Sequence, residues 1–418
     1  MTAASHRLGL AFAGTFAVLG ITVPYLGLWL EGRGLSETQI SLVMTTTTWV
    51  RAAYTPFVGN RADRNASHRN LCRVYACFAT LLTAVLFFDL RSFAGADLAF
   101  VFVFAFTLLA NVAYMPVIPL VDGIVLRSVQ EAQARGRRSD YAGLRIWASS
   151  AFLVVALAAG AFLEGKDPEY ILVLWCAMTF VAALSTIVLP HPPSSTEKRA
   201  SKGGFWQLLA RRELVLLFVA TALIQGSHGC YYAFGSIWWE RVGHDRDFIG
   251  LLWAEGVLAE IVFFFIAARF LTLRPKLLLY AGAAAAIVRW SILATFHDAA
   301  SLIAVQWLHA GSFAATHLAS MRWIQKQVAP ERVVTAQTLL ATIGGGLGPG
   351  LAIAVSGPLF RSYEAGAFWA MTGFAAAGAL VALFLPRADA KLGASLRPST
   401  DERDAQRADE GQDPLAEG

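Results

Sequence analysis

Two carboxylates lie inside one of the most apolar stretches of the chain. The stretch Phe248–Phe270 is long enough to cross a bilayer, yet it carries Glu255 and Glu260. A carboxylate in hydrocarbon is costly, so an intramembrane glutamate usually has a charge partner or a function. Because five residues turn an α-helix by about 140°, the two glutamates face different neighbours. Glu260 shares a stripe with Trp253 and Gly256 near the middle of the stretch, whereas Glu255 lies nearer one end.

Arginine and aspartate interrupt other apolar stretches. These residues are Arg51, Asp122, Arg145 and Arg289. With the two glutamates they make three positive and three negative charges, a balance expected where charges pair across a polar cavity. Arg289 lies at a depth similar to that of Glu255 in a neighbouring antiparallel helix, so we expect it to pair with Glu255 or to reach toward Glu260. Asp122 and Arg145 lie near the ends of their stretches, and an alternative is that they only reach interfacial water.

Polar side chains form stripes at helical spacing in two further stretches. One stripe consists of Gln225, His228, Tyr232 and Ser236, with Tyr231 beside it, and the other consists of His309, Ser312, Thr316 and Ser320, with His317 beside it. Imidazole titrates near neutral pH, and a buried histidine or tyrosine needs a hydrogen-bond partner, for which a substrate is one candidate. Hydrogen bonding between neighbouring helices is the alternative. His309 and Ser312 lack an orienting third group, so we expect no catalytic residues and no enzyme.

The composition indicates which elements hold these side chains. Of 418 residues, 56% are hydrophobic and 15% are charged, and the charges cluster between long apolar runs. This pattern is typical of an all-α, polytopic membrane protein. We predict twelve spans of about 20 residues, at 8–30, 37–59, 71–90, 98–125, 143–163, 170–189, 213–238, 248–270, 276–296, 300–321, 334–358 and 365–386. If the N-terminus is cytoplasmic, most Lys and Arg residues lie on the cytoplasmic side. We therefore expect both termini on the cytoplasmic side of the inner membrane.

A polar segment divides the chain into two halves of six spans. We predict an N-terminal bundle at 1–190, a flexible cytoplasmic linker at 191–212, a C-terminal bundle at 213–386 and a disordered tail at 387–418. Two equal halves suggest a transporter built from repeats, with its substrate site at mid-membrane between them.

Several kinds of partner are not expected. The net charge of +5 is spread over membrane-flanking loops rather than one folded face, which disfavours nucleic acid. The four cysteines, Cys72, Cys77, Cys176 and Cys230, show no metal spacing and no disulfide framework. We expect no metal and no cofactor, and a monomer in the lipid bilayer.

The loop after the second span carries a known pattern. Gly59 is followed by Asp63 and Arg64 and then by Arg69. This resembles the Gly-x-x-x-Asp-Arg loop of the major facilitator superfamily, although the usual glycine after Asp-Arg is absent and the second half lacks the equivalent glycine and aspartate. The resemblance implies a major facilitator fold of twelve helices in two pseudo-symmetric halves. It also implies that this loop is a conformational latch, with Gly59 allowing close helix approach.

Three spans resemble those of lactose permeases. Leu-Val-Asp122 and the fragment from Arg145 to Phe152 are similar to their acidic fourth and arginine-led fifth spans, and Phe152 takes the place of a sugar-stacking tryptophan. The stretch from His309 to Ile324 is similar to their tenth span, but Ser312 stands where those proteins carry a proton-carrying glutamate. The proton carrier must then lie elsewhere, and Glu260 is the candidate because burial and a nearby arginine act on a carboxyl's proton affinity in opposite directions.

The combined motifs are most similar to the phenylpropionate permease family, and the eighth span also resembles that of nucleoside permeases. The residues that carry this resemblance include His228, Tyr231, Tyr232, Trp253, Gly256, Glu260, Arg289 and His309. The resemblance implies proton-coupled symport of a small organic solute, with an aromatic or other organic acid favoured. We expect substrate contacts from Asp122, Arg145, Phe152, His228, Tyr231, Tyr232, Trp253 and Arg51, and proton coupling by Glu260, Arg289, His309, Glu255 and His317.

An anionic substrate would need Arg145, Arg289 or Arg51 free to bind it. The alternatives are a sugar or nucleoside symporter, an exporter of drugs or metabolites, and, from another class, a non-transporting receptor or scaffold. A receptor or scaffold would not need balanced charges at mid-membrane.

Overall fold

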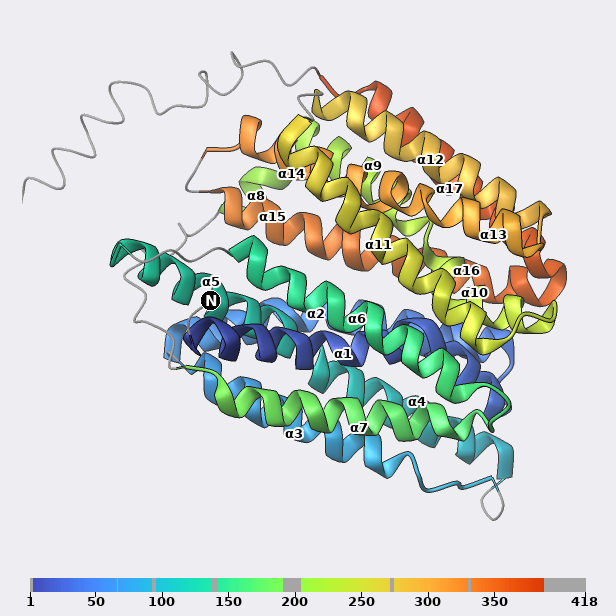
Figure 1. Cartoon of the computed structure of the whole chain (residues 1–418). Helices are drawn as coiled ribbons and strands as arrows, with labels where there is room; N and C mark the ends of the chain where they lie inside the picture. The colour runs from blue at the N-terminus through green and yellow to red at the C-terminus, as the bar shows by residue number, and fades with distance from the viewer. Residues whose placement is uncertain are drawn as a thin grey trace, which may run out of the picture.

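The described part of the protein is helical throughout. The computed structural model describes residues 3–65, 67–91, 95–136, 141–190, 204–270, 274–329 and 332–386, and these ranges contain no β-strand. The helices run roughly side by side along one axis (Figure 1). Long apolar runs favour this arrangement, because a helix satisfies its own backbone hydrogen bonds.

The first half of the chain supplies the lower layer of Figure 1. Its helices are α1 (Ala3–Gly32), α2 (Glu37–Asn65), α3 (His68–Val85), α4 (Gly95–Tyr114), α5 (Val117–Ala134), α6 (Tyr141–Leu163) and α7 (Glu169–Ser185), followed by the 3₁₀ turn η1 (Thr186–Val188).

The second half supplies the upper layer. Its elements are α8 (Gly204–Leu209), α9 (Arg212–Gly226), α10 (Gly229–Arg241), α11 (Arg246–Phe270), α12 (Pro275–Thr295), α13 (Ala299–Gln306), the π-helix η2 (Ala310–Ala315), α14 (Thr316–Gln327), α15 (Val333–Thr342), the π-helix η4 (Ile343–Leu347), α16 (Gly348–Tyr363), η5 (Glu364–Gly366) and α17 (Ala367–Leu383).

Each predicted span coincides with one helix or with a run of consecutive helices. Eight stretches of the described chain are long and apolar enough to cross a membrane, and one of them, Val333–Leu383, holds two predicted spans. The predicted spans outside these stretches fall on α2, α3 and the run from α13 to α14, which lie in the same bundle (Figure 1). The fourth span continues well past its predicted end, because α5 follows α4 after a bend at Pro116 and runs to Ala134.

Two predicted segments lie partly or wholly outside the described residues. Of the predicted linker, residues 191–203 fall outside, and the remainder contains the short helix α8. The tail at 387–418 also falls outside.

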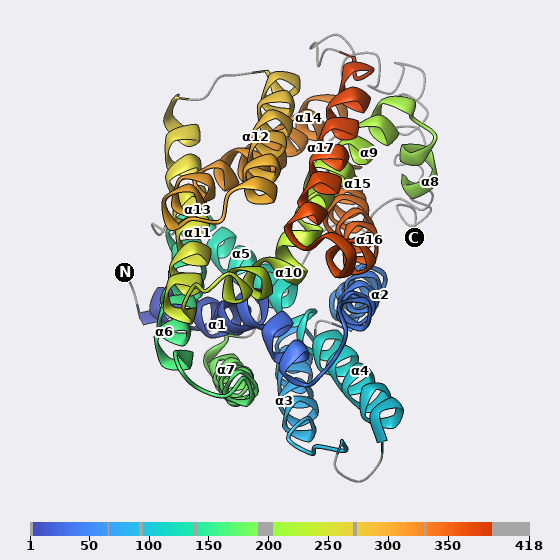
Figure 2. The same ribbon diagram turned by 90° about the vertical axis from the view of Figure 1, so that its right-hand side faces the viewer.

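The two halves meet closely at one end of the bundle, which we call the closed end. It is the right-hand end in Figure 1 and faces the viewer in Figure 2, where α1 and α6 lie against α10 and α11, and α2 lies against α16. The approach is tight because glycines form the contact: a Cβ added to Gly27 of α1 would lie 2.6 Å from the carbonyl oxygen of Ala233 in α10. Small residues of this kind let membrane helices pack with their backbones close together.

Ion pairs join the halves at the closed end. The guanidinium of Arg241 lies 2.5 Å from the carboxylate of Glu31 and 2.9 Å from that of Glu37, both in the first half. The buried side chain of Arg246 donates to the carbonyl oxygens of Leu163 and Lys166, also in the first half.

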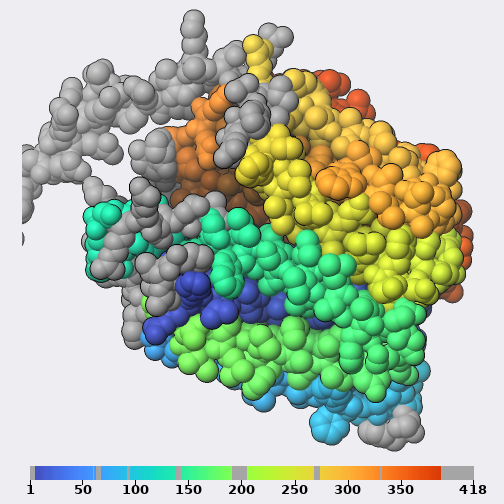
Figure 3. Space-filling view, in the orientation of Figure 1, coloured from blue at the N-terminus to red at the C-terminus, as the bar shows by residue number. Residues whose placement is uncertain are grey.

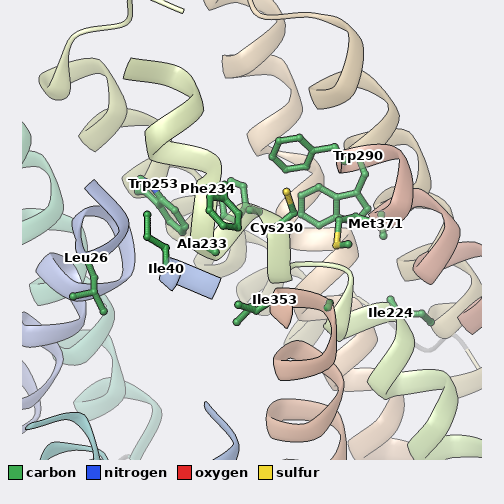
Figure 4. Packing of buried hydrophobic residues seen from close by; sticks show 14 of the residues in the cluster. Leu26, Ile40, Ile224, Cys230, Ala233, Phe234, Trp253, Trp290, Ile353 and Met371 are labelled. Carbon is green, nitrogen blue, oxygen red and sulfur yellow. The ribbon is translucent and has the colours of Figure 1, made fainter. Parts of the chain in front are cut away.

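The halves separate toward the opposite end, which we call the open end and which holds the N-terminus. Figure 3 shows the surface hollowed there between α6 and the helices α11 and α15. The buried core follows the same division. One apolar cluster joins both halves and includes Leu26, Ile40, Ala233 and Trp253 (Figure 4), whereas a second cluster around Phe12 contains residues of the first half only.

Candidate functional site

Irregular backbone places several candidate residues at the centre of the second half. Helix α9 ends at Gly226 and α10 begins at Gly229, so His228 lies at a break between two helices. His309 directly precedes the π-helix η2. π-Bulges are frequent at functional sites, and broken helices in a membrane occur where backbone is buried or lines a cavity.

His309 lies between a carboxylate and a guanidinium. Its Nε2 atom is 2.8 Å from Oε1 of Glu260 on α11, and its Nδ1 atom is 2.6 Å from an Nη atom of Arg289 on α12. The ring of His309 packs beside Gly256 of α11, where an added Cβ would be 3.4 Å from the ring, an ordinary van der Waals contact. The structure therefore links Glu260 to Arg289 through His309.

The partners of His309 define its tautomer. An arginine only donates hydrogen bonds, so Nδ1 of His309 must accept from Arg289 and carry no proton. The proton of a neutral ring is then on Nε2, where it donates to the carboxylate of Glu260. A neutral His309 with this tautomer links the carboxyl group of Glu260 to the guanidinium of Arg289.

Arg289 is fully buried, and its contacts are mainly with uncharged groups. Its second Nη atom donates to Oε1 of Gln306 at 2.8 Å. Its guanidinium also lies over two aromatic rings, 4.4 Å from the centre of Tyr231 and 4.7 Å from that of Trp290. These cation–π contacts stabilise a desolvated guanidinium.

His228 belongs to the same network. Its Nε2 is 3.2 Å from Oγ of Ser312, which lies 3.5 Å from Arg289, and its Nδ1 is 3.0 Å from the carbonyl oxygen of Gln225. Tyr231 donates to Gln306 at 3.2 Å. Both polar stripes thus face one another, and hydrogen bonds between helices use most of their groups.

An aromatic face borders this network. Tyr232 stacks on Trp253 and on His228, with interplanar angles of 18° and 25°. Trp253 is buried and donates to Oγ of Ser236 at 2.9 Å, while Tyr232 is only partly buried. Tyr232 interacts electrostatically with Glu260, Arg289 and, from the first half, Arg51. It is therefore within electrostatic range of charged residues from both halves.

The first half holds a separate charge pair. Arg145 donates to Oδ1 of Asp122 at 3.0 Å, and the hydroxyl of Tyr141 donates to the same oxygen at 2.5 Å. The side chain of Arg145 is 45% exposed and that of Asp122 is 34% exposed, although both lie on membrane helices. The pair is accessible from the open end, where the halves separate. Phe152 is only 8% exposed and is packed in the core rather than presented for stacking.

Several predictions from the sequence need correction. Glu255 is not the charge partner of Arg289: no ion pair joins them in the described part of the chain, and the Oε2 atom of Glu255 is buried without a hydrogen-bond partner. Arg289 does not contact Glu260 directly either, because His309 fills the space between them. The sequence places Glu255 and Arg289 at similar depths in the membrane, but depth alone does not show whether their side chains face each other.

The glycine of the predicted latch is not closely packed in this conformation. A Cβ added to Gly59 would meet no described atom within 4 Å, so this glycine is not at a close helix contact. Asp63 and Arg64 lie in the last turn of α2, and their side chains fall outside the described residues. Arg69 lies in the first turn of α3, and its Nε atom is buried without a partner. His317 is exposed and interacts electrostatically with Glu260 and Arg145.

The sequence reasoning missed two residues, one in the network of the second half and one at the charge pair of the first half. Gln306 accepts from both Arg289 and Tyr231 and is fully buried, and Tyr141 supports Asp122. The signal for Gln306 was available, since it is an isolated amide in an apolar run three residues before His309. No group of three or more His, Cys, Asp or Glu residues in the described ranges is arranged to hold a metal ion.

Comparisons with known proteins agree with this architecture. The model of the MFS_1-like family matches residues 8–371. A probable 3-phenylpropionic acid transporter of Escherichia coli strain K12 is 28% identical over 382 residues, covering 90% of this chain and 96% of that protein. The uncharacterized transporter YwbF of Bacillus subtilis strain 168 is 24% identical over 384 residues, covering 91% and 92%.

Solved structures show the same fold. The nucleoside transporter NupG aligns with a TM-score of 0.78 at 16% identity, covering 92% of this chain and 99% of that one. A bacterial homologue of the human lysosomal transporter Spinster, in an inward-facing and unoccupied conformation, aligns with a TM-score of 0.67 at 14% identity, covering 95% and 98%. The chain therefore belongs to the MFS_1-like family and is a multi-pass membrane transporter of the major facilitator type.

Proposed function

We propose that this transporter is a proton-coupled symporter of a small aromatic carboxylic acid, working as a monomer in the cytoplasmic membrane with both termini inside. With this orientation the open end faces the cytoplasm, and the conformation is open to the inside. Alternating access then requires the ion pairs and glycine contacts of the closed end to separate while the open end closes.

The observation that carries the proton-coupling proposal is the chain from Glu260 through His309 to Arg289. A carboxylate that is partly exposed at mid-membrane can exchange a proton with whichever side is open. When Glu260 is protonated, it no longer attracts the Nε2 proton of His309, and the hydrogen bonds that hold Arg289 rearrange. Protonation and the packing of α11, α12 and η2 are therefore linked, as coupling requires.

The choice of an aromatic acid has two supports. The relative with 28% identity is named as a probable 3-phenylpropionic acid transporter. The partly buried ring of Tyr232, stacked on Trp253, offers an aromatic surface beside the charged network. Aromatic rings in such offset arrangements attract a further ring more strongly than their buried area alone would suggest.

Uptake into proteoliposomes tests the proposal. Purified full-length protein is reconstituted, and accumulation of labelled 3-phenylpropionate is followed with the outside more acidic than the inside. We expect accumulation that a protonophore abolishes. Excess lactose and uridine should not compete, and competition by either would favour the sugar or nucleoside alternatives.

Glu260→Gln is the matching variant. It should lose accumulation driven by the pH gradient and retain exchange of labelled for unlabelled solute. Glu131→Gln is the control, because the ion pair that Glu131 makes with Arg135, one helical turn along, is exposed, and the variant should leave accumulation unchanged. Full pH-driven accumulation by Glu260→Gln would remove Glu260 from the coupling mechanism.

A further inference from the structure

The intramembrane arginines differ in how their charges are balanced. Arg145 has the carboxylate of Asp122 at 3.0 Å, and Arg289 is linked through His309 to Glu260. Arg51, in the middle of α2, has no carboxylate within 4 Å in the part of the chain that the structure describes. Unlike Arg145 and Arg289, Arg51 therefore has no acidic side chain among the described residues that balances its charge, either directly or through an intervening residue.

The contacts of Arg51 satisfy only part of its hydrogen-bonding capacity. One Nη atom donates to the carbonyl oxygen of Gly345 at 3.3 Å, and the other approaches the sulfur of Met115 at 3.7 Å. A guanidinium has five N–H donors, and a thioether is a weak acceptor. An unbalanced charge within a membrane helix is costly and marks a functional position, so a missing anionic partner is the expected completion of this site.

Two hydroxyl groups continue the same face of α2. Thr47 and Thr55 lie one helical turn before and after Arg51, so all three side chains share one face. The Oγ1 atoms of both threonines are buried without a hydrogen-bond partner. Buried polar groups are nearly always paired, and a stripe of unpaired donors around an arginine suits a bound oxygen anion.

An aromatic surface from the other half lies within reach of this stripe. Tyr232 interacts electrostatically with Arg51, and its ring stacks on Trp253. A solute with a carboxylate at one end and a ring at the other would therefore span the two halves. The bond from Arg51 to Gly345 already crosses between the halves, from α2 to η4.

We propose that Arg51, flanked by Thr47 and Thr55, binds the carboxylate of the transported solute while Tyr232 contacts its ring. This inference rests on the proposed function and narrows the substrate class to aromatic monocarboxylates. In this proposal the two transported charges bind at different sites. The solute anion binds to Arg51 in the first half, and the proton binds to Glu260 in the second half. One monocarboxylate and one proton together carry no net charge, so their symport is electroneutral.

Binding of an acid and its amide tests the inference directly. The affinities of purified full-length protein for 3-phenylpropionate and 3-phenylpropionamide are measured at one pH by the change in tryptophan fluorescence. We expect the wild type to bind the acid at least about tenfold more tightly, because charge-assisted hydrogen bonds are the strong ones. Equal affinities in the wild type would overturn the proposal without any variant.

Variants then assign the preference to Arg51. Arg51→Gln should bring the acid-to-amide ratio close to one, and Arg51→Lys should retain part of the preference because the charge remains. The ratio is measured within one sample, so a lower yield of folded protein does not affect it. Arg73→Gln is the control, since the hydrogen bonds of Arg73 within the described residues go to the backbone oxygens of Thr186 and Ile187, and it should keep the wild-type ratio.

Failure of this inference is distinguishable from failure of proton coupling. If Arg51→Gln keeps the full preference for the acid, the carboxylate is bound elsewhere and the inference is wrong, whatever drives uptake. If the preference depends on Arg51 but no pH gradient drives accumulation, the anion site stands and the proposed symport is wrong.

Discussion

The Nε2 atom of His309 lies 2.8 Å from the carboxylate of Glu260, at the middle of the second half. Both side chains remain partly accessible to solvent: that of Glu260 is 20% exposed and that of His309 is 9% exposed. The contact therefore combines a strong hydrogen bond with access for a proton. It also makes the state of Glu260 depend on Arg289, which holds the other side of the imidazole ring.

A double-mutant cycle should show that Glu260 and His309 act as one unit. His309→Phe keeps a ring against Phe313 but leaves Glu260 and Arg289 without their shared partner, so we expect a lower melting temperature in detergent. Because the pair is coupled, the double variant His309→Phe with Glu260→Gln should melt no lower than His309→Phe alone. Strictly additive losses in melting temperature would show that the two residues do not interact in solution.

Gly250 should control closure of the closed end. A Cβ added there would lie 2.7 Å from the carbonyl oxygen of Ala156 in the other half and 2.7 Å from the hydroxyl of Tyr25. Gly250→Ala should therefore hold the halves apart at this end and reduce initial uptake by about tenfold or more, with folding retained. Gly373→Ala is the matched control, because its added Cβ would meet no described atom within 4 Å. Normal uptake by Gly250→Ala would mean that transport does not require the close contact between Gly250 and Ala156.

The acid-side stability of the protein should depend on Asp89, which lies in the connection after α3. Hydrogen bonds from the Arg91 side chain lower the pKa of Asp89 to about 2, from an ordinary value of 3.8. A lowered pKa stabilises the fold above about pH 4, and this contribution is lost as the pH falls toward 2. Asp89→Asn should flatten the decline of the melting temperature between pH 4 and pH 2. An unchanged decline would show that the ion pair with Arg91 does not persist.

The sequence was sufficient for the fold because hydrophobic length is a strong signal. Runs of about 20 apolar residues can only be membrane helices, and their number and the polar segment after residue 190 indicate two halves. The residues of the site were also recognisable, since Glu260, Arg289 and His309 are costly in hydrocarbon and stand out for that reason.

Partnerships within the site were not predictable in the same way. The position of His309 between Glu260 and Arg289 depends on the π-helix η2, whose wider turn alters the regular helical spacing that the stripes assumed. The contacts of Arg241 with Glu31 and Glu37 join residues more than 200 positions apart, at helix ends whose exposed charges resemble those of any loop. Such contacts depend on how the two halves dock, and local sequence carries little information about docking.

Arg241 should bias the equilibrium between the two openings of the transporter. Its ion pairs with Glu31 and Glu37 exist only when the closed end is closed, so Arg241→Gln should favour the opposite state. All three side chains are partly exposed, and such pairs contribute about 0.2–1 kcal/mol each. The two pairs together then contribute about 0.4–2 kcal/mol, so the ratio of the two states should shift about two- to thirtyfold.

Spin labels at residues 131 and 326 report this shift, because the two positions lie on opposite halves at the open end, on α5 and α14. In a variant without its native cysteines, Arg241→Gln should add a population with a shorter distance between the labels. Arg91→Gln is the control, since the ion pairs of Arg91 with Asp89 and Glu169 lie within the first half and do not depend on the opening. If Arg91→Gln shifts the distances as much as Arg241→Gln does, general destabilisation rather than the contacts between the halves explains the change.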